Sequence, residues 1–254
     1  MPGLDSSAQT SEIDAILREM DAIIEDAQLR GDPLGFFAAM YRGVTLRVRD
    51  GIHSGRFDDG PRMDRFDAHF ARRYLDALAA WRTGAALTRS WRLVFEASVT
   101  HELTIIQHLL LGINAHINLD LAIVTAEFNA PTMARDFNTI NEIIGAMTED
   151  VQRVINEFSP GFHLIDRSLF SVDEAMANFS LKRARRDAWY HAQLLTNRDE
   201  EERERDYVYL DRRTAFLARL IRRPDGVSGH IFKLAKILES DDNRAILQAL
   251  ATLP

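Results

Sequence analysis

The chain has 254 residues, 46% of them hydrophobic and 27% charged, which is enough apolar material for a substantial core. The formal net charge of -7 argues against a nucleic-acid partner, because nucleic-acid binding needs a basic face. The chain has no cysteine, which excludes disulfides, thiolate catalysis and cysteine-ligated zinc and leaves any metal site to His, Asp and Glu.

Residues 1–10 are polar and predict a flexible tail, since no basic region is followed by the apolar run of a signal peptide. No stretch reaches about 18 uninterrupted apolar residues, the length of a transmembrane helix. The most apolar stretch, 103–124, is interrupted by Gln, His, Asn and Asp. We therefore expect a cytoplasmic protein without a membrane partner.

From residue 11 onward, apolar residues recur at the spacing of amphipathic helices, and no segment favours a strand. The first helix starts with a capping-box pattern at Ser11 and Asp14 and stops at the Gly-Asp-Pro of 31–33. The charged run RDEEERERDYVYLDRR predicts a solvent-facing helical surface with i,i+4 ion pairs. In chain order the expected helices are 11–30, 34–50, 62–82, 89–98, 101–128, 133–158, a helical pattern from 172 through LKRARRDAWYHAQLL, 207–222, and two short helices at the C-terminus.

These elements predict an all-α fold in which residues 11–254 form one domain. The helix at 101–128 is apolar on nearly every side, as expected of a helix at the centre of a bundle. We therefore predict a single multi-helix bundle packed around this buried central helix.

The central helix also carries polar side chains on several faces, which is unusual because burying an unpartnered polar group costs about 1–3 kcal/mol. Gln107, Asn114 and Asn118 share one face, and His116 and Asp120 are neighbours on another. The two asparagines are candidates to orient a substrate. The alternative is that these groups hydrogen-bond one another and fix the packing of the helices.

Spacing of four residues lets His116 and Asp120 converge on one ion from successive helical turns. A His nitrogen and an Asp oxygen suit a divalent metal such as zinc, iron or manganese, with zinc favoured here and Asp67 as third ligand. The alternative is metal-free acid–base catalysis by the same pair, because the carboxylate fixes the imidazole tautomer. His108 lies about 12 Å along the axis from His116 and is expected to act separately, as a proton shuttle.

Asp67 lies between Phe66 and Phe70 in the third helix, where apolar neighbours are expected to raise its pKa and suit it to general acid or base catalysis. The alternative is an ion pair between Asp67 and Arg72 or Arg73. His69 is expected at the surface.

Two later segments offer candidate substrate-binding residues. Asn141 lies beside the apolar stripe of 133–158, although capping a neighbouring backbone is its simpler role. Arg186 and Trp189 combine a cation with an aromatic surface and are candidates to line a pocket. The alternative is that they form an aromatic anchor with an arginine reaching into solvent.

Several common catalytic motifs do not occur in the sequence, including the P-loop, G-x-G-x-x-G, G-x-S-x-G and HExxH. We therefore expect neither a nucleotide nor a flavin cofactor.

Three blocks together resemble a bacterial family that is catalogued as a domain of unknown function: RFDAHFARRYLDALAAWR at 65–82, SWRLVFEA at 90–97 and QHLLLGINAHINLDL at 107–121. The resemblance extends from about residue 34 and includes FNTINEII at 137–144 and RRDAWYHA at 185–192. It implies no reaction, but it places eleven residues in motif blocks: Asp67, Tyr74, Trp91, Gln107, His108, Asn114, His116, Asn118, Asp120, Asn141 and Trp189. A fainter similarity to fungal zinc-dependent lyases, described as hemocyanin-like, favours the metal hypothesis.

The sequence is thus consistent with a small-molecule enzyme whose buried His/Asp site performs hydrolase, lyase or cyclase chemistry. In this hypothesis His108 and Asp67 are catalytic, His116, Asp120 and Asp67 bind a metal, and Asn114, Asn118, Asn141, Tyr74, Arg186 and Trp189 bind the substrate. The alternative is a non-catalytic helical protein whose polar residues bind a ligand or fix helix packing. A homo-oligomer is compatible with either hypothesis.

Overall fold

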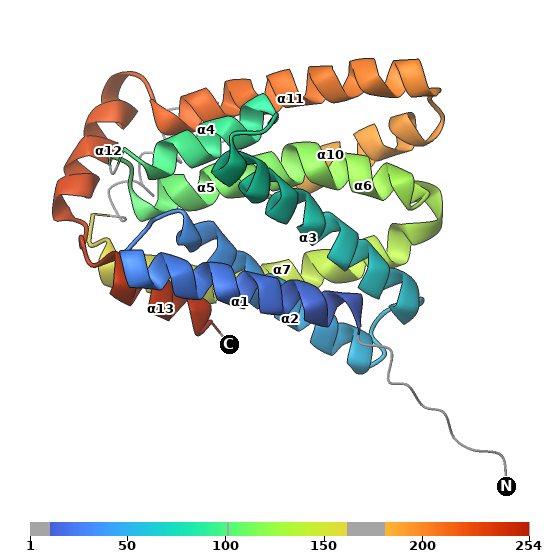
Figure 1. Ribbon diagram of the computed structural model, residues 1–254, viewed down its shortest axis with the longest axis horizontal. Helices are drawn as coiled ribbons and strands as arrows, with labels where there is room; N and C mark the ends of the chain where they lie inside the picture. The colour runs from blue at the N-terminus through green and yellow to red at the C-terminus, as the bar shows by residue number, and fades with distance from the viewer. Residues whose placement is uncertain (1–10, 101, 162–180, 254) are drawn as a thin grey trace, which may run out of the picture.

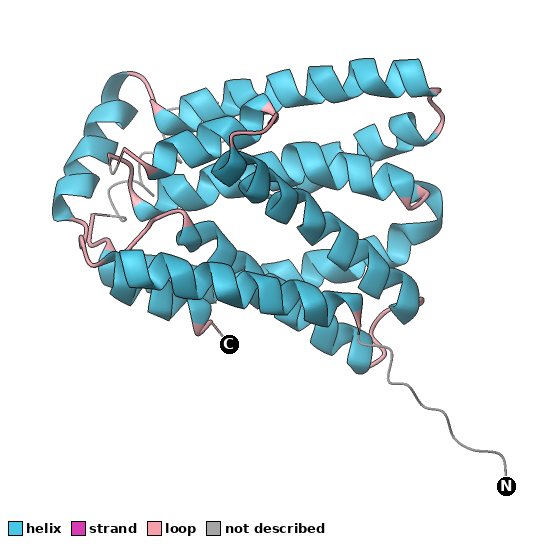
Figure 2. Cartoon of the chain, viewed as in Figure 1, coloured by secondary structure: helices cyan, strands magenta, loops and turns pink. Residues whose placement is uncertain are grey.

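Helices make up all the regular structure in residues 11–100, 102–161 and 181–253, the part of the chain that the computed structural model describes (Figure 2). This confirms the predicted all-α fold. The elements are α1 (Glu12–Arg30), α2 (Gly35–His53), α3 (Gly60–Thr83), α4 (Arg89–Ser98), α5 (Ile105–Ala115), η1 (His116–Asp120), α6 (Leu121–Glu127), η2 (Ala130–Met133), α7 (Ala134–Phe158), α10 (Leu181–Thr196), α11 (Glu200–Arg222), α12 (Gly226–Leu238) and α13 (Asn243–Ala251).

Capping residues explain where two helices differ from their predicted bounds. The central helix starts at Ile105 because Thr104 and Gln107 form a capping box. Helix α11 starts at Glu200, before the predicted 207, because Asp199 and Glu202 cap each other's backbone N–H groups. The charged run is therefore helical from Glu200 onward. The part of the predicted pattern at 172–180 lies outside the described residues.

Helices α5, η1 and α6 run on from one another as the central helix, with α4 and α11 on one side and α1, α2, α7 and α13 on the other (Figure 1). Helix α10 packs along α6, and α3 crosses the same segment. By length and composition alone the segment Ile105–Glu127 could cross a membrane, but 83% of its most apolar window is buried inside the fold. Such burial is what a core helix shows.

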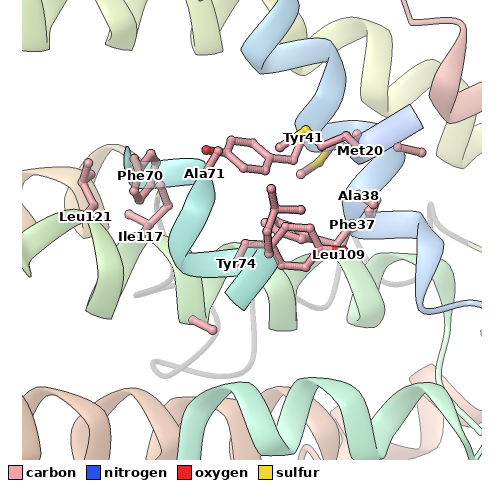
Figure 3. Packing of buried hydrophobic residues seen from close by; sticks show 14 of the residues in the cluster. Met20, Phe37, Ala38, Tyr41, Phe70, Ala71, Tyr74, Leu109, Ile117 and Leu121 are labelled. Atoms are coloured by element: carbon pink, nitrogen blue, oxygen red, sulfur yellow. The ribbon is translucent and has the colours of Figure 1, made fainter. Parts of the chain in front are cut away.

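Aromatic side chains fill the space between α2, α3 and the central helix. Phe37 and Tyr41 extend from α2 toward Phe70 and Tyr74 of α3 (Figure 3), with ring centroids 5.1 Å apart for Phe37 and Tyr74 and 6.1 Å apart for Tyr41 and Phe70. Gly112 lets Phe37 of α2 pack directly against the central helix, because a Cβ at position 112 would lie 2.4 Å from the Phe37 ring. The close contact brings α2 directly against the polar part of the central helix.

Candidate functional site

The segment His116–Asp120 forms a π turn inside the central helix. The N–H of Leu121 donates to the carbonyl of His116, five residues back. Single π turns within α-helices are rare and occur frequently at functional sites. The sequence pattern predicted an ordinary α-helix here, so the π turn is a feature that the structure adds.

The predicted His116–Asp120 pair is present, with Nδ1 of His116 3.2 Å from Oδ2 of Asp120. The indole N–H of Trp91 donates to the same oxygen at 2.9 Å, and Nε of Arg73 donates to Oδ1 at 3.3 Å. Because these neighbours make the carboxylate an acceptor, we assign the His116 proton to Nδ1. Its Nε2 then carries a lone pair.

Aromatic rings hold His116 in place. Its imidazole stacks on Phe70, with centroids 3.7 Å apart and planes 11° apart, and Tyr41 lies at 4.5 Å. Burial lowers the pKa of His116, although the bond to Asp120 opposes the shift. The imidazole is therefore neutral at pH 7, and its Nε2 has no hydrogen-bond partner in the described part of the chain.

His116 lines a pocket of about 240 Å³ between α2, α3, the central helix, α7 and α10. Apolar cavities of about 150 Å³ are large enough to bind benzene. The pocket therefore has room for a larger organic molecule. Most of its lining is apolar, including Met40, Val44, Phe70, Ile113, Ile144 and Met147.

Four residues that line this pocket each have a polar atom that is buried without a hydrogen-bond partner among the described residues: Tyr41 Oη, Asp67 Oδ2, His116 Nε2 and Arg185 Nη2. They come from α2, α3, η1 and α10, so the tertiary fold brings them together. An unsatisfied buried polar group costs about 1–3 kcal/mol. A cluster of such groups around an apolar pocket is typical of a ligand-binding or catalytic site.

The predicted effect of burial on Asp67 is supported. The side chain is 3% exposed, and burial raises its pKa to about 7, with repulsion by Asp64 adding to the shift and Arg185 opposing it. The predicted alternative, an ion pair with Arg72 or Arg73, is wrong. Arg72 pairs with Glu19 and Arg73 with Asp120, because both arginines point away from the apolar face that holds Asp67. His69 is at the surface, as predicted, where it contacts Glu127.

Arg185 and Tyr41 are pocket residues that the sequence interpretation missed. Arg185 is 3% exposed, donates from Nε to Oδ1 of Asn141, and lies 4.8 Å over the Phe137 ring. Burial lowers its pKa to about 10, so it remains a cation at pH 7. The signal that could have found it is the small buried face of α10, where Arg185 follows Ala184 and precedes Ala188 by three residues. Tyr41 lies in the helix predicted at 34–50, whose apolar spacing gave no sign of a site.

Several predicted site residues lie away from this pocket and make packing contacts. Asn114 donates to the carbonyl of Thr214 at 3.0 Å, and Asn118 donates to Oδ1 of Asn114 at 3.0 Å. His108 is buried with its ring edge-on to Phe36, at 5.8 Å. Tyr74 packs against Phe37 and Trp91. The contacts of Asn114 and His108 join the central helix to α11 and α2, and those of Tyr74 join α3 to α2 and α4, as in the packing alternative.

Arg186 and Trp189 line a second hollow, together with Asn141. Trp189 packs on Phe137 with ring centroids 4.8 Å apart. The bond between Arg185 and Asn141 lies between this hollow and the apolar pocket, because Arg185 lines one and Asn141 the other. The substrate-binding role predicted for these residues stays a prediction.

The three predicted metal ligands do not come together at one point. His116 and Asp67 line the pocket, whereas Asp120 is turned toward Arg73 and Trp91. Within residues 11–100, 102–161 and 181–253, no group of three or more His, Asp or Glu side chains is arranged to hold a metal. Zinc binding therefore stays a prediction without a defined ligand set.

Fold and site together define an all-α protein with an apolar pocket that carries buried titratable groups. The model of the family of unknown function DUF5995 matches residues 13–224, and the chain belongs to this family. The match begins before residue 34, where the resemblance was expected to start. No curated protein and no solved structure matches the chain, so the similarity to fungal lyases is not shown.

Proposed function

We propose that this protein is an enzyme that acts on an apolar small molecule by acid–base chemistry in the pocket beside His116. One observation carries the proposal: four residues from four helices line a single apolar pocket, and each has a buried polar atom without a described partner. Such groups lower the stability of the fold unless a bound molecule engages them. Hydrolysis, elimination and cyclisation are candidate reactions, because none of them needs an organic cofactor.

His116 is the proposed general base. Its Nδ1 is held by Asp120, so Nε2 can take a proton from a bound molecule or from water. Asp67 is the proposed general acid, because a carboxyl with a pKa of about 7 is largely protonated at slightly acidic pH. A paired acid and base usually consist of two titratable groups whose surroundings shift their pKa values in opposite directions.

Tyr41 and Arg185 supply hydrogen-bond donors at the same pocket. Burial raises the pKa of Tyr41 well above its ordinary value, so its hydroxyl keeps its proton. Donors fixed in an apolar surrounding stabilise negative charge that develops during a reaction. We propose that these two side chains have that role.

The test begins with a thermal-shift screen for small apolar compounds that stabilise the full chain. Each stabilising compound is then incubated with the wild type and with His116→Gln and Asp67→Asn, and products are identified by mass spectrometry. We expect conversion by the wild type and at least a hundredfold slower conversion by both variants. Equal conversion by His116→Gln would show that His116 is not the base.

The metal version is tested by elemental analysis of the purified protein and of His116→Ala. Loss of a stoichiometric metal from a variant that still folds would make His116 a ligand. An unchanged metal content would show that His116 holds no metal.

The second candidate function is binding without turnover, which the apolar lining of the pocket favours. Compounds that stabilise the wild type but are recovered unchanged would support this function over the enzyme.

A further inference from the structure

Arg185 differs from other partly buried arginines of this protein because no carboxylate pairs with it among the described residues. Four of these pair with carboxylates at 2.9–3.3 Å: Arg47 with Asp150, Arg62 with Asp136, Arg73 with Asp120 and Arg213 with Asp187. Arg185 is more buried than these, yet no carboxylate among the described residues lies within ion-pair distance of it. Its contacts are the neutral amide of Asn141 and the face of Phe137.

A buried cation without a counter-ion is costly, and chains normally avoid one. Asp67 lies on the same pocket and attracts Arg185, but its pKa of about 7 leaves it only partly charged at neutral pH. Nη2 of Arg185 has no hydrogen-bond partner among the described residues, while the rest of the lining is mostly apolar. The pocket thus combines apolar walls with one positive charge.

We infer that the ligand of this pocket is an apolar carboxylate, whose head group accepts hydrogen bonds from Arg185 and Tyr41 and whose apolar body contacts the side chains of α2 and α7. One guanidinium matches a single negative charge and forms a planar pair with a carboxylate. A phosphate monoester carries close to two charges and would leave one unpaired. Scaled from the cavity that binds benzene, the volume suits about ten carbon atoms. The inference names the ligand class for the proposed function and rests on the same pocket.

The test compares three ten-carbon probes that differ only in the head group: decanoate, decan-1-ol and decylamine. Binding of each to the full chain is measured by calorimetry below its aggregation concentration. We expect decanoate to bind at least tenfold more tightly than decan-1-ol, and decylamine to bind most weakly. This comparison uses the wild type alone and does not depend on how a variant folds.

Arg185→Met is expected to weaken decanoate binding at least tenfold and to change decan-1-ol binding less than threefold. Arg186→Met tests the second hollow, which this exposed arginine lines. Arg212→Met is the control, because this exposed arginine of α11 lines neither that hollow nor the apolar pocket. It should change the dissociation constant of decanoate less than twofold.

Equal affinity of the wild type for decanoate and decan-1-ol would overturn the inference. Equal loss of decanoate binding in Arg186→Met and Arg185→Met would also overturn it, by placing the carboxylate in the second hollow. Because binding is measured directly, tight carboxylate binding without conversion of any compound would refute the enzyme and leave the inferred ligand class intact.

Discussion

Burial shifts the pKa values of His116 and Asp67 in opposite directions, although both residues line the same pocket. Removal from water disfavours the charged form of each group, which lowers the pKa of His116 and raises that of Asp67 to about 7. Near pH 7 His116 is therefore neutral, and Asp67 is still partly protonated. In that state one accepts a proton and the other donates one.

The pH dependence of catalysis follows from these two groups. Turnover requires His116 without its proton and Asp67 with its proton. As the pH is raised, kcat/KM should first increase while His116 loses its proton, at a pH below 6.5, and should then decrease around pH 7 as Asp67 ionises. The measurement is kcat/KM against pH for any compound that the screen shows to be converted. A rate that keeps rising through pH 8 would exclude Asp67 as the acid.

Asp67 also links stability to pH. Its folded-state pKa of about 7 lies above the ordinary 3.8, so the folded state binds the proton more tightly and loses stability as the pH rises between these values. Asp67→Asn removes this penalty. At about 1.4 kcal/mol per pKa unit, the variant should be more stable than the wild type by on the order of 4 kcal/mol at pH 8, and by much less near pH 5.

Urea unfolding of both proteins at the two pH values measures this difference. A variant less stable than the wild type at pH 8 would mean that the ionised carboxylate is satisfied in the fold.

We predict that Asp120 stabilises the fold and also keeps the proton of His116 on Nδ1. Asp120→Asn keeps the shape but leaves too few acceptors for Arg73, Trp91 and His116, which should cost about 1–3 kcal/mol. Unfolding measures the cost, and ¹⁵N NMR of the histidines shows whether the proton leaves Nδ1. Asp26→Asn, at an exposed ion pair, is the control and should cost at most about 1 kcal/mol. An unchanged tautomer would contradict the positioning role.

Among the elements, the central helix depends on a close approach at Gly112. Alanine favours a helix by up to about 1 kcal/mol over glycine. At Gly112 the added Cβ would lie 2.4 Å from Phe37, and overpacking of this kind costs about 1–3 kcal/mol. The clash outweighs the propensity, so Gly112→Ala should destabilise the protein.

Gly145→Ala in α7 is the matched control, because nothing lies within 4 Å of its added Cβ. It should stabilise the protein by about 0.4–1 kcal/mol. Thermal and urea unfolding of both variants gives the two signs. A stabilised Gly112→Ala would show that α2 and the central helix are farther apart than described.

At the scale of the whole molecule, α13 completes the wall of helices behind the pocket, although it lies beyond the part of the chain that matches the family. It packs against α1, α2 and α7, and two of these, α2 and α7, line the pocket. Leu247 is fully buried in this contact, directly against Gly35.

Leu247→Ala should therefore cost about 2–5 kcal/mol, the usual range for a buried leucine. Ile237→Ala is the control, because Ile237 is 78% exposed and its loss should change stability by less than about 0.5 kcal/mol. Chemical unfolding measures both. A cost below 1 kcal/mol for Leu247→Ala would mean that α13 does not unfold together with the bundle.

Local sequence pattern was sufficient for the helices and for part of the site. The spacing of apolar residues decides which face of a helix is buried, and it predicted α4 at its observed bounds. The contact between His116 and Asp120 spans four residues of one helix, and the burial of Asp67 follows from Phe66 and Phe70 beside it. These features depend on neighbours in the chain, which a sequence displays directly.

Only the tertiary structure decided which polar groups share a pocket. Helical periodicity shows that a residue faces inward but not which other helix it meets. It therefore indicated neither that Arg185 lines the apolar pocket while Arg186 lines the second hollow, nor that Asn114 donates to Thr214 of α11. Tyr41 and Arg185 are far apart in sequence and meet only because α2 and α10 both pack around the central helix. The shifts in pKa have the same origin, because burial depends on every helix that surrounds the group and not on its neighbours in the chain.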